Sequence, residues 1–120
     1  MAKDNLIVNK TFDFSLVTIE LYKHLTTNKE YVLSKQLLRS ATSVGANVEE
    51  AVGSISKREF TAKMGISLKE ARESRYWLRL LDKSQLVEYN YSKQLKDIEE
   101  IVNILTAIVK TSQLQLAKNL

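Results

Sequence analysis

Residues 37–51 read LLRSATSVGANVEEA, and this stretch decides the fold. At ~100° per residue it forms a helix with two long faces, one apolar and one polar. The apolar face runs on past the stretch and consists of Leu37, Ala41, Val44, Val48, Ala51, Val52 and Ile55. The polar face beside it, which we call the polar ladder, consists of Arg39, Ser43, Asn47 and Glu50. We therefore expect this helix to pack against a hydrophobic core.

Gly45 lies at the edge of that apolar face. A glycine inside a helix costs about 1 kcal/mol relative to alanine, so it usually marks a place where another backbone comes close. Its position predicts a tight contact with a neighbouring helix.

The composition of the 120-residue chain favours a single all-α domain spanning residues 1–120. Hydrophobic residues make up 44% and charged residues 27%, which is typical of a folded protein. The chain has no proline and only three glycines, so it lacks the turn residues that a multi-stranded sheet needs. It has no cysteine, which excludes disulfides, thiolate zinc sites and cysteine nucleophiles.

The helical spacing of apolar residues recurs along the chain. It predicts helices at residues 12–26, 28–53, 57–84 and 92–114. Because the links between them are short, consecutive helices should be antiparallel neighbours. The predicted fold is an up-down-up-down four-helix bundle.

Side chains at the predicted helix starts match capping patterns. Thr11 is expected to cap the first helix, and residues 27–30 form a capping box for the second. Ser56 begins a further capping box for the third helix, with Ile55 and Phe60 placed to form a hydrophobic staple.

Several predicted helices carry more apolar surface than one buried face requires. In the first helix, Phe12, Leu16 and Ile19 make one stripe, and a second is made by Phe14, Val17, Leu21 and Leu25. In the third, Ile66 and Trp77 lie beside the core face. Such a surplus indicates a partner, often a second copy of the chain, although a small bundle can also pack broad stripes internally.

The chain shows neither a secretory signal nor an apolar run of the ~20 residues that a membrane span needs. A soluble, cytoplasmic protein without membrane contact is therefore expected. The net charge of +4 favours nucleic acid or another acidic partner.

No arrangement of residues indicates an active site, so we expect a protein that is not an enzyme. His24 is the only histidine, and nothing near it supplies a nucleophile turn or a metal-binding partner. The carboxylate pairs Glu70 with Glu73 and Glu99 with Glu100 are typical of solvated helical faces. No glycine-rich phosphate loop is present, and no cofactor or metal is expected.

Basic residues on the third predicted helix offer a candidate binding surface, which we call the basic ridge. About a fifth of the helical circumference holds Arg58, Lys69, Arg72, Tyr76, Arg79 and Lys83, and no acidic residue. Such a line of charge can follow phosphates along a strand or duplex, with Tyr76 available to stack on a base. It specifies no base sequence. The alternative is an ordinary solvated face partly neutralised by neighbouring acids, and both interpretations remain open.

The polar ladder also allows two interpretations. If it lies between helices, its members need partners such as Glu70 or Arg75 of the third helix, and their role is structural. Alternatively, Arg39, Ser43 and Asn47 line a channel in an oligomer.

The chain resembles the four-helix-bundle family of 23S rRNA intervening-sequence proteins from about Phe12 to Val109. The residues that carry the resemblance are Gln36-Leu37-Leu38-Arg39-Ser40, Ser43-Val44-Gly45-Ala46-Asn47-Val48-Glu49-Glu50-Ala51, Glu59-Phe60, Ile66-Ser67-Leu68-Lys69-Glu70-Ala71 and Tyr76-Trp77-Leu78. Ala51 departs from the pattern, since many members have glycine there, and a less sharp helix end is the expected consequence.

The resemblance implies a small bacterial bundle that assembles into a homopentameric barrel. Some relatives are encoded within intervening sequences of 23S rRNA genes. Others resemble the accessory variability determinant of diversity-generating retroelements, a basic barrel that binds nucleic acid and a reverse transcriptase. The resemblance does not imply a constitutive ribosomal subunit, and for most members the molecular role is unassigned.

Together these features predict a non-enzymatic, oligomeric accessory protein that binds RNA or DNA nonspecifically through the basic ridge. The alternative is a protein-interaction scaffold without nucleic-acid binding, whose apolar side stripes and Trp77 recruit a reverse transcriptase or another protein. The two functions differ in whether the ridge or the apolar surface makes the decisive contact.

Overall fold

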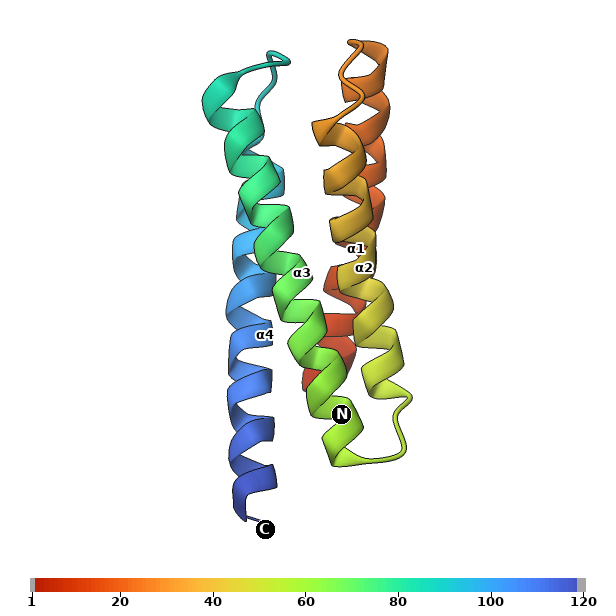
Figure 1. Cartoon of the computed structure of the whole chain (residues 1–120), viewed down its shortest axis with the longest axis vertical. Coiled ribbons are helices and arrows are strands. Elements are labelled where there is room, and N and C mark those ends of the chain that lie inside the picture. Colours follow the sequence, from red (N-terminus) through yellow and green to blue (C-terminus); the bar gives the residue numbers. More distant parts are fainter. Residues whose placement is uncertain (1, 119–120) are drawn as a thin grey trace.

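Four antiparallel helices form an up-down-up-down bundle (Figure 1), which confirms the predicted fold class. They are α1 (Ala2–Thr27), α2 (Leu33–Val52), α3 (Lys57–Ser84) and α4 (Ser92–Lys118). The computed structural model describes residues 2–118, with side chains from Leu6 onward, and that range contains no strand. The bundle measures 51 × 23 × 22 Å.

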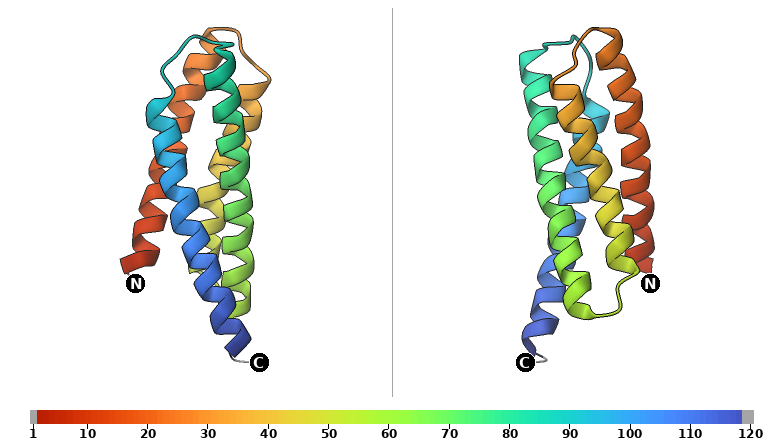
Figure 2. Two further views of the ribbon diagram at one scale, coloured as in Figure 1. Left: turned by 90° about the vertical axis from the view of Figure 1, so that its left-hand side faces the viewer. Right: turned by 45° about the vertical axis from the view of Figure 1, so that its right-hand side comes forward.

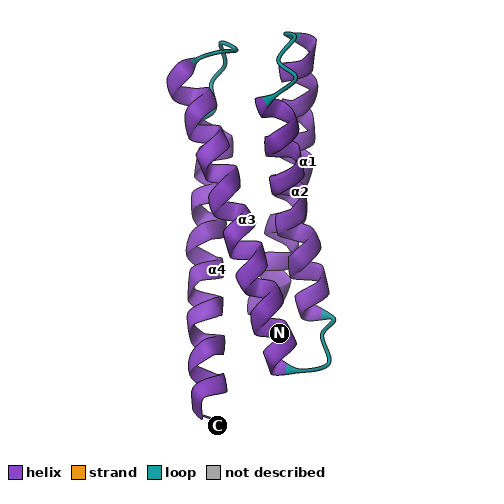
Figure 3. Cartoon of the chain, in the orientation of Figure 1, coloured by secondary structure: helices purple, strands orange, loops and turns teal. Residues whose placement is uncertain are grey.

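Each helix packs on two others around a closed square, and the α1–α4 contact is the least extensive of the four. The α1–α2 and α3–α4 links lie at one end of the bundle and the α2–α3 link at the other (Figures 1 and 2). Only these short links interrupt the helices (Figure 3). None of the four helices is long and apolar enough to cross a membrane.

The apolar face of α2 lies in the core as predicted. Its buried members are Leu37, Ala41, Val44, Val48 and Ala51. Val52 and Ile55 were expected to continue this face, but they are 45% and 97% exposed. The reason is that α2 ends at Val52, so residues beyond it no longer follow the helical repeat.

Gly45 makes the predicted close contact. A Cβ atom at this position would lie 3.2 Å from the backbone oxygen of Thr11, so only glycine lets α1 approach this closely without adjustment. On the other side of α2, small side chains bring α3 close. The Ser40 and Ser74 hydroxyls are 2.8 Å apart, and Ser67 donates to the Val44 carbonyl oxygen.

The first helix begins at Ala2, and not at residue 12 as predicted. Thr11 is therefore no cap. It lies inside α1, where its buried hydroxyl donates to the Ile7 carbonyl oxygen at 2.7 Å. A threonine that satisfies its hydroxyl on the preceding turn is compatible with a helix interior, and Ile7 continues the buried stripe toward the N-terminus.

The second helix begins at Leu33, so the predicted start at residue 28 is wrong. Thr27 belongs to α1, and its hydroxyl donates to the Lys23 carbonyl oxygen. Lys29 has a φ of 65°, a left-handed conformation that ends the preceding helix. The capping box at residues 27–30 therefore does not form, because the chain uses these residues to close α1.

The third helix begins and ends where predicted, and Ser56 accepts a hydrogen bond from the Glu59 backbone N–H at 3.1 Å. The predicted hydrophobic staple is wrong, since Ile55 is almost fully exposed. The fourth helix begins at Ser92 as predicted but continues to Lys118 instead of ending at residue 114. Ser112, inside the predicted range, is buried against Thr61 of α3, and the added turn beyond residue 114 is mainly exposed.

Candidate nucleic-acid interface

The basic ridge occupies the face of α3 opposite the core. All of its side chains are exposed: Arg58, Lys69, Arg72, Tyr76, Arg79 and Lys83. From Arg58 to Lys83 the ridge extends ~37 Å at ~1.5 Å rise per residue. In the part of the chain whose side chains the structure describes, no carboxylate oxygen lies within 4.0 Å of the charged nitrogen atoms of a ridge cation.

Two acidic side chains of α3 point away from the ridge, toward α2. The Arg39 guanidinium donates to the Glu70 carboxylate at 2.9 Å and also to the Glu73 carboxylate. Glu73 and then Glu70 raise the pKa of Arg39 above its ordinary value. Both carboxylates pair with Arg39 rather than with a ridge cation, although the charge of Lys69 also helps to lower the pKa of Glu73.

Glu73 has a second contact that leads back to the ridge. Its carboxylate accepts a hydrogen bond from the Trp77 indole Nε1–H at 3.0 Å. This bond, followed by the contact with Arg39, lowers the pKa of Glu73 against the opposing effect of burial. The Trp77 ring in turn meets the Tyr76 ring edge to face, with centroids 5.2 Å apart and an interplanar angle of 69°. The half-exposed Tyr76 ring thus contacts a second ring that is itself held by a hydrogen bond.

The remaining members of the polar ladder lie along the α2–α3 boundary. Ser43 donates to the Arg39 carbonyl oxygen, and Asn47 donates to the Ser43 carbonyl oxygen. Glu50 pairs with Lys63 of α3 at 2.8 Å. Arg75, named above as another possible partner, binds Glu99 of α4 instead, because it projects from the opposite side of α3.

The carboxylates considered for catalysis are engaged by cations. Glu70 and Glu73 bind Arg39, Glu99 binds Arg75, and Glu100 binds Lys10 at 2.7 Å. His24 packs on the Tyr89 ring with centroids 4.7 Å apart. Within the described part of the chain, no three His, Asp or Glu side chains group as metal ligands would.

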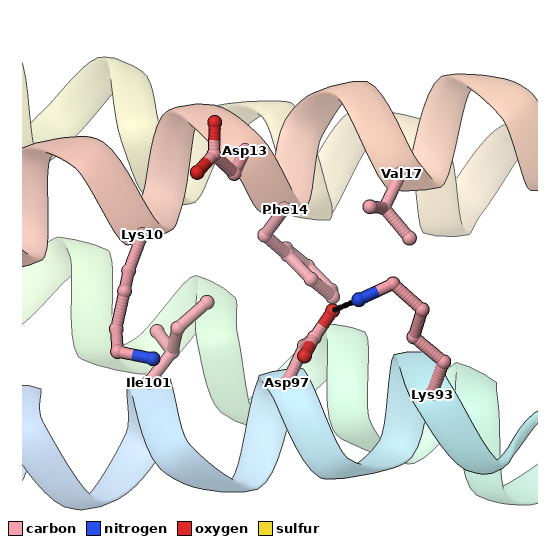
Figure 4. Close-up of a pocket in the computed structure, with 7 residues that line it drawn as sticks. All are labelled: Lys10, Asp13, Phe14, Val17, Lys93, Asp97 and Ile101. Atoms are coloured by element: carbon pink, nitrogen blue, oxygen red, sulfur yellow. Dashed lines mark hydrogen bonds and ion pairs between the residues drawn. The ribbon is translucent and has the colours of Figure 1, made fainter.

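Two surface pockets lie away from the basic ridge and the polar ladder. A groove of about 290 Å³ between α1 and α2 is lined by Phe12, Ser15, Thr42, Gly45, Ala46 and Glu49. A smaller pocket of about 160 Å³ lies between α1 and α4 (Figure 4), lined by Lys10, Asp13, Phe14, Val17, Lys93, Asp97 and Ile101. In the smaller pocket the Lys93 ammonium group binds Asp97 at 3.2 Å. Periodicity could have pointed to the groove, since Phe12 lies on one of the two apolar stripes of α1 and Gly45 marks the close approach of α1 to α2.

The sequence of the chain matches the family of 23S rRNA-intervening sequence proteins over residues 3–107. The chain belongs to this family. The structure of this 23S rRNA-intervening sequence protein is similar to the crystal structure of a protein of unknown function from the S23 ribosomal protein family of Bacteroides thetaiotaomicron. The TM-score is 0.84 and the sequence identity 42%, over 90% of this chain and 98% of the other. Among curated proteins, none matches the chain.

In this 23S rRNA-intervening sequence protein, contacts in the structure join the α2 and α3 parts of the resemblance. Arg39 comes from the α2 part of the pattern, whereas Glu70 and Trp77 come from the α3 part. In the structure they form one network through Glu73, which binds both Arg39 and Trp77. The pattern thus describes an α2–α3 contact with the ridge on its outer side.

Proposed function

We propose that this 23S rRNA-intervening sequence protein is a non-enzymatic, cytoplasmic, oligomeric accessory protein that binds RNA or DNA nonspecifically through the basic ridge. The observation that carries the proposal is an exposed line of cations without an acidic side chain among them. The ion pairs of Glu70 and Glu73 support it as well, because these carboxylates pair with Arg39 of α2 and not with a cation of the ridge.

The physical basis of such binding is neutralisation of phosphates and release of their counterions. If all five cations of the ridge contact phosphates, the logarithm of the binding constant should fall against the logarithm of salt concentration with a slope of about −3.5 on a single strand and −4.5 on a duplex. Nonspecific binding of this kind depends on charge rather than on base sequence.

A charge reversal tests the proposal. We expect the triple variant Arg72→Glu, Arg79→Glu, Lys83→Glu to lose most of its affinity for a fluorescent oligonucleotide at low salt and to show a flatter salt dependence. The measurement is fluorescence anisotropy over a range of salt concentrations.

The matched control is the triple variant Lys35→Glu, Lys96→Glu, Lys110→Glu, which changes the net charge equally at exposed positions on α2 and α4. Equal losses in the two variants would show that only net charge matters and would reject the ridge. No binding by the unmodified protein at low salt would reject nucleic-acid binding altogether.

A second candidate function rests on the α1–α2 groove, where Phe12 is 58% exposed beside a hollow of about 290 Å³. A protein-interaction scaffold would use such a surface to bind a partner, and the reverse transcriptase implied by the resemblance is one such partner. The variant Ala46→Arg would fill the groove without touching the ridge. A reverse transcriptase encoded beside the gene that binds the triple charge-reversal variant but not Ala46→Arg would favour this function over the first.

A further inference from the structure

An aromatic ring lies among the cations of the basic ridge. Tyr76 is 52% exposed. Arg72 lies four residues before it and Arg79 three residues after it, about one helical turn in each direction. Lys69 and Lys83 each lie seven residues away, ~10 Å along the axis at ~1.5 Å per residue. The tyrosine is thus flanked by two cations on either side.

The Tyr76 ring is also supported on the protein side. It meets Trp77 edge to face, and the Trp77 indole is tied by its N–H to Glu73, which Arg39 binds from α2. A ring supported in this way loses little conformational freedom when a ligand packs on it. The Tyr76 side chain nevertheless stays about half open to solvent, at 52% exposed.

Such an arrangement suits bases that are not stacked inside a duplex. In a duplex the bases are paired and stacked, so a side chain on the outer face of a straight helix meets mainly phosphate and sugar. In a single strand the bases can turn out and stack on an aromatic ring while neighbouring phosphates meet cations. An aromatic ring between cations is the combination that nonspecific single-strand binders use.

We infer that the ligand of the basic ridge is single-stranded nucleic acid, with one base stacked on Tyr76 and the flanking phosphates held by Lys69, Arg72, Arg79 and Lys83. This inference rests on the proposed nucleic-acid binding and names the class of ligand within it. Arg39, Glu73 and Trp77 act as positioning residues for the ring.

The test compares binding of oligo(dT) with binding of a mixed-sequence duplex of the same length. We expect Tyr76→Leu to weaken oligo(dT) binding by roughly tenfold, the usual loss for one base–aromatic stack, and to leave duplex binding unchanged. Tyr76→Phe keeps the ring and should bind oligo(dT) like the unmodified protein. The matched control is Tyr31→Leu, which removes another tyrosine, 61% exposed, from the α1–α2 link.

A second readout reports the position of the base. Trp77 is the only tryptophan, so its emission reports on the neighbourhood of Tyr76. Oligo(dT) should quench that emission in the unmodified protein, and the duplex should not.

The failure of this inference differs from the failure of the proposed function. If Tyr76→Leu has no effect, or weakens both probes equally, while reversal of Arg72, Arg79 and Lys83 still abolishes binding, the ridge binds phosphates without stacking and the single-strand inference is overturned. If neither probe binds the unmodified protein at low salt, both are overturned.

Discussion

Glu30 shows how one side chain starts a helix in this bundle. Its carboxylate accepts hydrogen bonds from the backbone N–H groups of Val32, Leu33 and Ser34, the last at 2.6 Å. Burial by itself raises the pKa of Glu30, but these backbone hydrogen bonds outweigh it and the pKa is lowered overall. A negative charge here satisfies N–H groups that have no partner within α2 and complements the positive end of its dipole.

Removing this carboxylate should cost stability in a pH-dependent way. A group whose folded pKa is lowered stabilises the folded state above its unfolded pKa, and loses that effect as the pH falls through the folded value. We expect Glu30→Ala to lower the free energy of unfolding by about 1–2 kcal/mol at pH 7. The difference from the unmodified protein should shrink as the pH falls below about 4.5.

Urea unfolding followed by circular dichroism at several pH values measures this difference. Glu88→Ala, at an exposed position in the α3–α4 link, serves as the control. A loss at Glu30 that stays constant from pH 7 to the acid range would contradict the role of the charge.

At the scale of the elements, the spacing between helices is set by small residues on α2. Gly45 faces the backbone of α1, and Ser40 meets Ser74 of α3 through their hydroxyls. These contacts bring both neighbouring helices close to α2. The close packing at the α1–α2 and α2–α3 interfaces therefore depends on small residues of α2. Gly65 of α3 contrasts with Gly45, because nothing lies within 4 Å of the Cβ atom that alanine would add there.

The two glycines therefore predict opposite responses to the same substitution. Gly65→Ala should raise the free energy of unfolding by up to about 1 kcal/mol, since alanine favours the helix. Gly45→Ala should lower it, because the added Cβ would lie 3.2 Å from the Thr11 backbone oxygen, and α1 would have to shift as a whole.

Thermal and urea unfolding of the two variants, side by side with the unmodified protein, measure both effects. Equal stabilisation by both substitutions would mean that α1 moves away from α2 at little cost. The close packing of α1 on α2 would then contribute little to the free energy of unfolding.

At the scale of the whole molecule, the two outer surfaces of interest are made by different helices. The basic ridge lies on α3, whereas the exposed apolar side chains Phe12, Leu16 and Ile19 lie on α1, with Phe12 also lining the groove. A second copy that covers the α1 stripe would therefore leave the ridge available to nucleic acid. This division supports, within the proposed function, an oligomer that presents several ridges at once.

Light scattering coupled to size-exclusion chromatography tests this division. We expect a mass that is a multiple of the 13.7 kDa chain, five-fold if the homopentamer implied by the resemblance forms. Leu16→Glu should reduce the mass to that of one chain because it places a charge within the covered stripe. The control Leu114→Glu changes a side chain of similar exposure, 57% against 49%, on α4. A single-chain mass for the unmodified protein, or an unchanged mass for Leu16→Glu, would rule out this interface.

The sequence alone determined what depends on local periodicity. A step of ~100° per residue assigns each side chain to a face whatever the neighbours are, so the core face of α2 and the acid-free sector of α3 could both be read from spacing. The bounds of α3 and the start of α4 also agree with the prediction. Ser56 caps α3 by a hydrogen bond with a close neighbour in the sequence, so the start of this helix is a local feature as well. Whether the ridge binds nucleic acid stays a prediction.

The tertiary structure decided whatever depends on neighbours. Both apolar stripes of α1 have the spacing of a buried helical face. In the structure, however, the stripe that contains Phe14, Leu21 and Leu25 is buried, and the stripe that contains Phe12 is exposed. Which stripe is buried depends on how α1 is rotated about its axis where it packs against Gly45 of α2. The spacing of residues within α1 does not specify this rotation. The start of α2 also depends on tertiary structure. Several nearby polar side chains could accept hydrogen bonds from its first N–H groups, and the buried position of Glu30 makes Glu30 the acceptor. Arg39 likewise found Glu70 and Glu73 because α3 packs at its side, and this contact supports the aromatic pair at the ridge.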